Sequence, residues 1–145
     1  MSRGYPDFSG ATAFPTRKHF KTQSCLVGAI ADGVTANVFS LSGQTIIEGG
    51  FLTLWTVALL NMVIIIGQID GSIVSADSLG DAKYFERCGE NNHIYTISLY
   101  DPDLFTAELK MQKNYYCGYE YILRVFNNTG FAMTPGGEIW YSDVT

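Results

Sequence analysis

The sequence predicts an all-β fold, an antiparallel β-sandwich or jelly roll preceded by an extended N-terminal arm. Short runs rich in β-branched and aromatic residues follow one another from residue 24 onward. Turn-forming residues separate these runs at intervals of roughly 8–12 residues, as is typical of sandwiches. A chain of 145 residues is long enough for one domain with a single core. We therefore assign residues 1–23 to the arm and residues 24–145 to one sandwich domain.

The arm is predicted from its lack of any period. Residues 1–23 show neither helical spacing nor strict alternation, and they contain Pro6 and Pro15. Disordered tails contain few aromatic residues, so aromatic side chains that recur here favour a strap docked on a surface. That surface belongs either to the same domain or to a neighbouring subunit. The aromatic residues expected at this contact are Tyr5, Phe8, Phe14 and Phe20.

The first strands of the sandwich are predicted at residues 25–30, 34–41 and 45–48. Asp32-Gly33 is a typical two-residue hairpin signal between the first two. Ser42-Gly43 provides the turn before the third.

The longest uncharged stretch lies between Glu48 and Asp70. Its length meets the requirement of about 20 residues for a membrane helix, but its flanks are acidic and carry no cluster of Lys or Arg. Gly49-Gly50 opens the stretch and Asn61 divides it, which favours two strands at residues 51–60 and 62–69. Because both faces of these strands are apolar, we expect them to be central in the sandwich or buried against another subunit.

Residues 75–92 are the least β-like part of the chain. Asp77 or Ser78 is placed to cap a short helix that runs through Cys88 and ends at Gly89. A long polar loop is the alternative. The apolar side of the helix would consist of Leu79, Ala82 and Phe85.

The remaining strands are predicted at residues 73–74, 93–100, 105–111, 119–126 and 138–141. Turns are expected at residues 70–71, 101–103, 127–130 and 135–137. Residues 127–129 also match the acceptor motif for N-glycosylation, and we interpret them as a hairpin turn.

Composition limits the class of partner. The net charge of −5 argues against a nucleic-acid backbone as the main partner. Charged residues make up 16% of the chain, below the typical value of about 25%, while Tyr and Phe number nine each. Such a composition fits either a surface covered by other subunits or a sandwich with ordinary aromatic usage. The one basic cluster is interpreted as a solvated turn and consists of Arg17, Lys18, His19 and Lys21.

No pattern in the sequence indicates catalysis, a metal or a cofactor. His19 and His93 are the only histidines, and neither lies in a nucleophile motif. Two distant histidines do not form a zinc site, and the acidic residues do not match a calcium loop. The three cysteines are widely spaced, so at most one internal disulfide can form. Cys25 and Cys117 are expected to be small core residues, and the pairing state of Cys88 stays open.

The first residues contain no apolar segment of the kind found in signal peptides, so synthesis in a host cytoplasm is expected. By elimination, the predicted function is a structural, self-assembling protein without enzymatic activity. A viral or phage capsid decoration protein or minor capsid protein, located in the virion, fits best by analogy of fold. It would form a homo-oligomer, preferably a trimer, contact neighbouring capsid subunits and have no membrane span. Besides the arm, the expected interface consists of Leu54, Val57, Leu59, Ile64 and Ile66.

A carbohydrate- or receptor-binding sandwich is the alternative function. Aromatic rings stack on sugar faces, and several tyrosines cluster late in the chain. The residues expected to stack on a ligand are Tyr115, Tyr116, Tyr119 and Tyr121.

Overall fold

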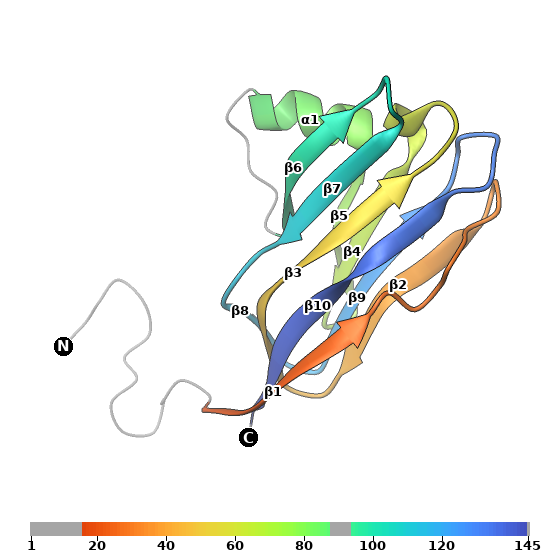
Figure 1. Ribbon diagram of the computed structural model, residues 1–145. Coiled ribbons are helices and arrows are strands. Elements are labelled where there is room, and N and C mark those ends of the chain that lie inside the picture. Colours follow the sequence, from red (N-terminus) through yellow and green to blue (C-terminus); the bar gives the residue numbers. More distant parts are fainter. Residues whose placement is uncertain (1–15, 88–93, 145) are drawn as a thin grey trace.

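A computed structural model describes residues 16–87 and 94–144, which form two antiparallel sheets packed face to face (Figure 1). The first sheet has the order β1 (Arg17–Ser24), β10 (Thr134–Val144), β3 (Thr45–Trp55), β7 (Thr106–Met111) and β6 (Tyr95–Asp101), and β8 (Tyr115–Cys117) also pairs with β3. The second sheet has the order β2 (Thr35–Ser42), β9 (Glu120–Phe126), β4 (Ile64–Ile69) and β5 (Ser72–Ser78). Helices η2 (Leu60–Met62) and α1 (Leu79–Arg87) lie in the connections after β3 and β5.

The strand order defines a jelly roll. The chain passes from one sheet to the other after β1, β2 and β3, and again after β5, β8 and β9. Each sheet therefore combines strands from both ends of the chain, as two Greek keys wrapped around one core require. The predicted fold class, an all-β antiparallel sandwich, is confirmed.

Alternating strands supply the core between the sheets. In β9, the alternating residues Tyr121, Leu123 and Val125 are buried. The facing side chains of the first sheet include Leu52 and Leu109, which are fully buried. One continuous cluster of buried apolar residues thus joins the two layers.

The long uncharged stretch forms the end of β3, η2 and β4, so the prediction of two strands is confirmed. No helix in the described part of the chain is long and apolar enough to cross a membrane. The first strand begins earlier than predicted, because β3 runs from Thr45 straight through Gly49-Gly50. The register with β10 slips by one residue there and leaves Glu48 as the extra residue of a β-bulge. Gly49 and Gly50 adopt φ values of 144° and 139°, which is why glycines stand inside this strand.

Three predicted boundaries near the N-terminus are wrong. Residues 17–23 were assigned to the arm, but β1 pairs with β10 and is an edge strand of the sandwich. Residues 25–30 are not a strand: Ile30 makes only an isolated bridge to Met133, so Asp32-Gly33 does not join two strands of a hairpin. The place beside β10 is already occupied by β1, and residues 25–34 cross from one sheet to the other.

Two further predicted segments differ from the structure at their boundaries with strands. The helix is confirmed from Leu79 to Arg87, and Ser78 caps it by accepting a hydrogen bond from the N–H of Asp81 at 3.1 Å. Residues 75–78, however, belong to β5, and the predicted end at Gly89 lies outside the described residues. The final strand begins at Thr134 instead of residue 138, because the predicted turn at 135–137 is part of β10. The short strand β8 was not predicted.

The turn between β4 and β5 is confirmed at Asp70-Gly71, with φ values of 50° and 83°. The carboxylate of Asp70 accepts hydrogen bonds from the backbone N–H groups of Gly118, Tyr119 and Glu120 at 2.9, 2.8 and 3.0 Å. Desolvation alone would raise the pKa of Asp70, but these three hydrogen bonds outweigh it and lower the pKa. One side chain therefore joins the β4–β5 turn to the β8–β9 turn.

This carboxylate predicts acid-dependent stability. Because its folded pKa lies below the unfolded value of about 3.9, its contribution is present above pH 4 and is lost as the pH falls through the folded pKa. We expect Asp70→Asn to lower the free energy of unfolding by about 1 kcal/mol at pH 7, since hydrogen bonds to charged groups are the stronger ones. Urea denaturation from pH 7 to pH 2 should show the difference shrinking below pH 4. A difference that does not change with pH would contradict this role.

Candidate assembly surface at the loop end of the sandwich

Four connecting segments meet at one end of the sandwich, at the upper right of Figure 1. Trp55, the last residue of β3, pairs with both Thr106 and Thr134, which begin β7 and β10. The N–H of Thr56 donates to the carbonyl of Phe105 at 3.1 Å, and Ile30 bridges to Met133. We call this region the loop end; it consists of residues 30–34, 55–63, 102–105 and 127–133.

The loop end exposes large apolar side chains. Between 39% and 68% of each of seven side chains is accessible to solvent. Exposed apolar side chains gathered in one region are typical of interaction sites, whereas single ones are ordinary. We call these seven residues the loop-end surface: Val34, Trp55, Val57, Leu59, Met62, Leu104 and Phe131.

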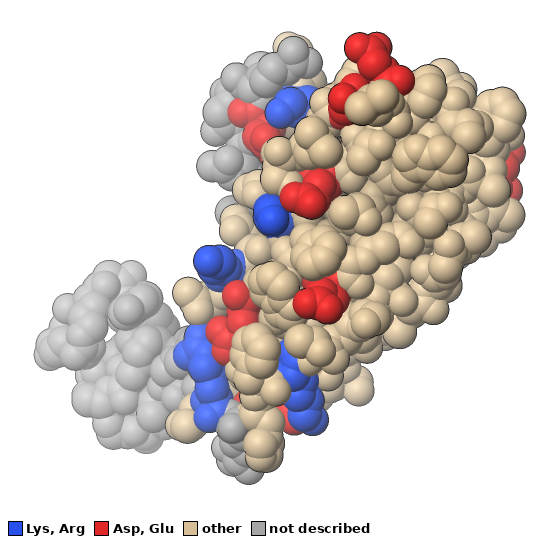
Figure 2. Space-filling model, in the orientation of Figure 1, with Lys and Arg blue, Asp and Glu red and all other residues tan. Residues whose placement is uncertain are grey.

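Charge is nearly absent from the same region. The four segments contain no Lys or Arg, and their only charged residues are Asp32 and Asp103. In Figure 2 most of the visible Lys and Arg side chains gather toward the end where β1 begins, and the upper right of the molecule shows none. The loop-end surface can therefore be covered without burying a cation, which would be costly to desolvate.

A buried asparagine fixes the loops that present this surface. The side chain of Asn127 is fully buried and donates hydrogen bonds to the carbonyls of Ile30 at 2.8 Å and Phe131 at 2.6 Å. Its amide oxygen accepts from the N–H and the hydroxyl of Thr129 at 3.1 and 2.7 Å. The backbone of Asn127 is bonded as well, to Gly33 and Val34. One side chain thus ties together two of the four loops, those that carry Val34 and Phe131.

The same hydrogen bonds show whether the N-glycosylation motif at residues 127–129 can carry a glycan. The amide nitrogen of Asn127 is buried and uses both of its hydrogens inside the fold, so it offers no site for a glycan. The interpretation of residues 127–130 as a hairpin turn is wrong, because β9 and β10 belong to different sheets and these residues begin the crossover between them.

Two non-glycine residues of the loop end have left-handed backbones. Leu59 and Phe105 both have φ of 52°. This conformation costs an L-residue with a large side chain roughly 1–2 kcal/mol. Strained residues of this kind concentrate at functional loops, where the surrounding structure holds them.

The predicted interface residues within the described part of the chain lie in four different places. Val57 and Leu59 belong to the loop-end surface. Ile64 and Ile66 lie on the outer face of β4 and are half-buried, while Phe20 on β1 is 65% exposed. The prediction for Leu54 is wrong, because its side chain is fully buried in the core between the sheets. Tyr5, Phe8 and Phe14 lie outside the described residues.

The sequence missed the other members of the loop-end surface. Trp55 was detectable in principle: alternation along β3 turns Leu54 inward and therefore turns its neighbour outward. Val34, Met62, Leu104 and Phe131 lie in different connections, and only the fold brings them to one end.

The four tyrosines do not form a stacking platform. The prediction for Tyr121 is wrong, because it is 2% exposed and its hydroxyl contacts the sulfur of Met111 at 3.5 Å in the core. Burial raises its pKa. The hydroxyl of Tyr119 donates to the carbonyl of Asp70 at 2.6 Å. Tyr115 and Tyr116 are neighbours in β8, so their side chains point to opposite sides of the strand.

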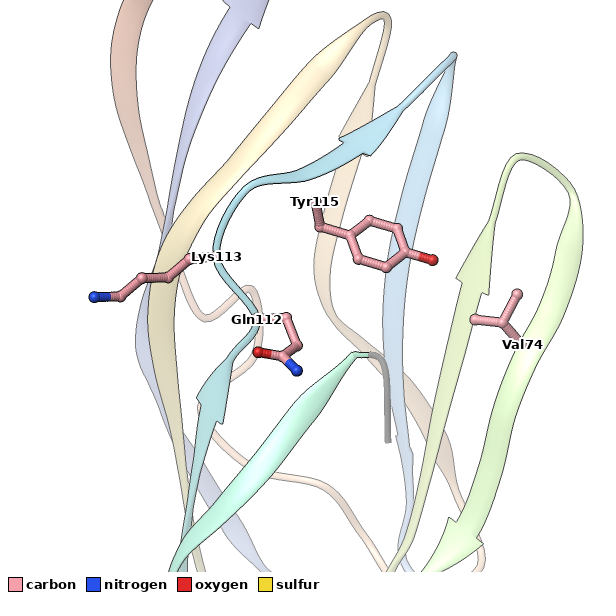
Figure 3. A pocket seen from close by; sticks show the side chains of 4 residues that line it. All are labelled: Val74, Gln112, Lys113 and Tyr115. Carbon is pink, nitrogen blue, oxygen red and sulfur yellow. The ribbon is translucent and has the colours of Figure 1, made fainter. Parts of the chain in front are cut away.

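Tyr115 lines an open cleft instead. The cleft measures about 540 Å³ and is also lined by Val74, Gln112 and Lys113 (Figure 3). Figure 3 shows the Tyr115 ring pointing from β8 toward β5, the strand that carries Val74, while the ammonium group of Lys113 points away. The cleft lies between one edge of the second sheet and the β7–β8 connection of the first.

Within residues 16–87 and 94–144, no three His, Cys, Asp or Glu side chains gather in a way that could hold a metal ion. His19 is exposed on β1, and His93 lies outside the described residues. Burial raises the pKa of the Cys117 thiol to about 12 and also raises that of Cys25, so both remain protonated at neutral pH. Cys117 is buried as predicted, and Cys25 is partly buried against the core.

No protein-family model matches the chain, and no curated protein matches its sequence. Solved structures of similar strand arrangement include one titled as the infectious bursal disease virus Gx strain, with 14% identity, 89% of this chain covered and a TM-score of 0.42. Another is the infectious bursal disease virus VP2 subviral particle, with 11% identity, 87% covered and a TM-score of 0.44. The matched region is 33% of each of those chains, so this chain spans about a third of their length. Identity and TM-score are too low to carry a function over.

Proposed function

We propose that this chain is a structural, self-assembling subunit whose loop-end surface packs against other copies of itself. The observation that carries the proposal is the set of seven exposed apolar side chains at the loop end, where the buried amide of Asn127 ties two of the four loops together. Fully burying a large apolar side chain stabilises an assembly by roughly 1.5–3 kcal/mol, so a few such contacts suffice to offset the entropy lost on association.

A closed ring, with a trimer favoured, fits the proposal. Copies arranged around a rotation axis can bury their loop ends against one another once, without leaving an apolar surface free to form fibres. Asp32 and Asp103 then lie at the rim, where water keeps them charged.

The class of assembly is inferred by analogy of fold. Jelly rolls build viral capsids and also lectins. A viral or phage capsid decoration protein or minor capsid protein, carried in the virion and contacting neighbouring capsid subunits, combines this fold with self-association through an apolar surface. No enzymatic activity forms part of the proposal.

A carbohydrate-binding module is the second candidate, favoured by the open cleft at Tyr115. An aromatic ring beside the amide of Gln112 is a combination that binds sugars. A glycan array discriminates the two functions: the assembly protein binds no glycan, and the module binds at least one through Tyr115.

A matched pair of leucine substitutions tests the assembly surface. Leu59 and Leu99 are 55% and 47% exposed, but only Leu59 belongs to the loop-end surface. We expect Leu59→Asp to shift the mass measured by light scattering toward the 16.0 kDa of one chain, because a carboxylate would have to be desolvated at the contact. Aspartate also tolerates the left-handed backbone at this position better than most residues.

Leu99→Asp, on the outer strand β6, should leave the oligomer unchanged. Equal masses for the unmodified chain and Leu59→Asp would refute the assignment of the interface. Dissociation by Leu99→Asp alone would place the interface elsewhere.

A further inference from the structure

β5 is an outer strand with an accessible edge. Among the described strands it pairs only with β4, and it ends the order of the second sheet. Ile73 and Val74 are 63% and 49% exposed, and Asp77 is the only charged residue between positions 72 and 78. Natural sheets usually protect such edges with lysine, proline or bulges, because a bare edge pairs with other chains; residues 72–78 contain no lysine or proline, and β5 carries one bulge.

The bulge in β5 directs a side chain toward the cleft. The register with β4 slips between Gly67 and Gln68, which leaves Val74 as the extra residue. A bulge of this kind can re-aim the side chain it carries. Val74 forms one wall of the cleft of about 540 Å³ that Tyr115 and Gln112 line from the other sheet (Figure 3). A strand added along β5 would therefore run beside an open cleft lined by Val74 and Tyr115 as well as by the polar side chains of Gln112 and Lys113, and pockets beside an added strand give strand addition its specificity.

The chain itself contains a segment suited to this edge. Fifteen residues precede Thr16, and at about 3.3 Å per extended residue they reach up to about 50 Å. Their aromatic side chains are Tyr5, Phe8 and Phe14, and their only charged residues are Arg3 and Asp7.

The position of β1 favours a neighbouring copy as the acceptor. β1 and β5 lie at opposite sides of the sandwich (Figure 1). β1 is the outer strand of the first sheet on the side where β10 contacts β2. β5 is the outer strand of the second sheet on the other side, next to α1. If the segment before β1 of one copy binds the β5 edge of the next copy, the contact between the copies is head-to-tail. Repeated around an axis, such a contact closes into a ring.

We propose that residues 1–15 of one copy add as a strand to β5 of the next copy and place one aromatic side chain in the cleft between Val74 and Tyr115. This inference rests on the proposed function, because it requires that copies assemble. Backbone hydrogen bonds to the β5 edge would supply affinity, and the cleft would select the aromatic residue.

Photo-crosslinking in the full chain tests the contact. Phe8 is replaced by p-benzoylphenylalanine, and the protein is unfolded and refolded with an equal amount of unmodified ¹⁵N-labelled chain, irradiated and digested. We expect crosslinks from the modified segment to residues 72–78 or 112–115 of the ¹⁵N-labelled chain. Crosslinks confined to the same chain, to the loop end or to other positions would overturn the proposal. The same photo-reactive residue at Tyr84, exposed on α1, is the control for random proximity.

An edge variant separates this proposal from the proposed function. Ile73→Lys adds a charge to the β5 edge, and Thr35→Lys adds one to the edge of β2 as the matched control. We expect Ile73→Lys in the acceptor chain to reduce the crosslink yield at least tenfold and Thr35→Lys to leave it unchanged. An oligomer that forms without this crosslink refutes strand addition and leaves assembly through the loop end standing. A monomer without crosslinks refutes both.

Discussion

Replacing Gly137 by alanine is expected to destabilise the sandwich by at least about 3 kcal/mol, a large part of the 5–15 kcal/mol typical of a domain. Gly137 lies in β10 opposite Leu52, with φ of 125°, in a region that L-residues rarely adopt. An added Cβ would lie 2.1 Å from the carbonyl oxygen of Phe51 and 3.2 Å from the Cα of Leu52, both backbone atoms that cannot move without opening the ladder between β10 and β3.

Gly136 is the matched control. Its φ lies outside the left-handed region, and an added Cβ would meet only the hydroxyl oxygen of Thr53, at 3.1 Å. Urea denaturation of Gly136→Ala should therefore show a loss of no more than about 1 kcal/mol. Equal losses for the two variants would mean that the close approach of β10 to β3 at Gly137 is not present in solution.

Asn127→Asp is expected to cost about 3 kcal/mol at neutral pH. The carboxylate cannot donate to the carbonyls of Ile30 and Phe131, and it would place a buried negative charge next to their oxygens. Aspartate still accepts from Thr129, so the loss combines the two donated hydrogen bonds with the cost of the buried charge. Thermal unfolding measures the effect, and part of it should be recovered at acid pH, where a protonated carboxyl can donate one hydrogen bond.

Asn128→Asp provides the control, since Asn128 is the exposed neighbour. Its unfolding temperature should stay within about 2 °C of that of the unmodified chain. A similar loss for both variants would show that general charge repulsion, and not the buried amide, accounts for the effect.

Elements with a strong local pattern could be predicted from the sequence. Residues 119–126 alternate in residue type, and the strand predicted there is found as β9, which alternates between half-buried and buried residues. Asp70-Gly71 is a two-residue turn because aspartate and glycine both tolerate positive φ. The cap at Ser78 follows from the hydroxyl that accepts from the N–H of Asp81.

Elements that depend on a partner distant in the sequence could not be predicted from the sequence. β1 is polar and lacks alternation, and it is a strand because β10 offers it an edge. The glycines at positions 49, 50 and 137 look like strand boundaries, yet they lie inside β3 and β10. Gly50 and Gly137 lie where the two backbones approach closely, and Gly49 lies against the ring of Trp140. Nothing in their local sequence distinguishes a close approach from a turn.

Only part of the candidate site could be predicted, because its residues also come together from distant parts of the sequence. Val57 and Leu59 stand in an apolar run and were found, whereas Leu104 and Phe131 are single apolar residues in polar turns. The jelly roll brings these loops together over more than 70 positions of sequence, as the contact between Thr56 and Thr129 shows. Leu54 was placed in the interface because an apolar run does not reveal which face of the strand is inward.

The mass of the unmodified full chain in solution tests the central claim most directly. Sedimentation equilibrium over a hundredfold range of concentration should give a closed oligomer, an integral multiple of 16.0 kDa with three copies favoured, that does not grow further as the concentration rises. A mass of 16.0 kDa throughout this range would contradict self-assembly through the loop-end surface.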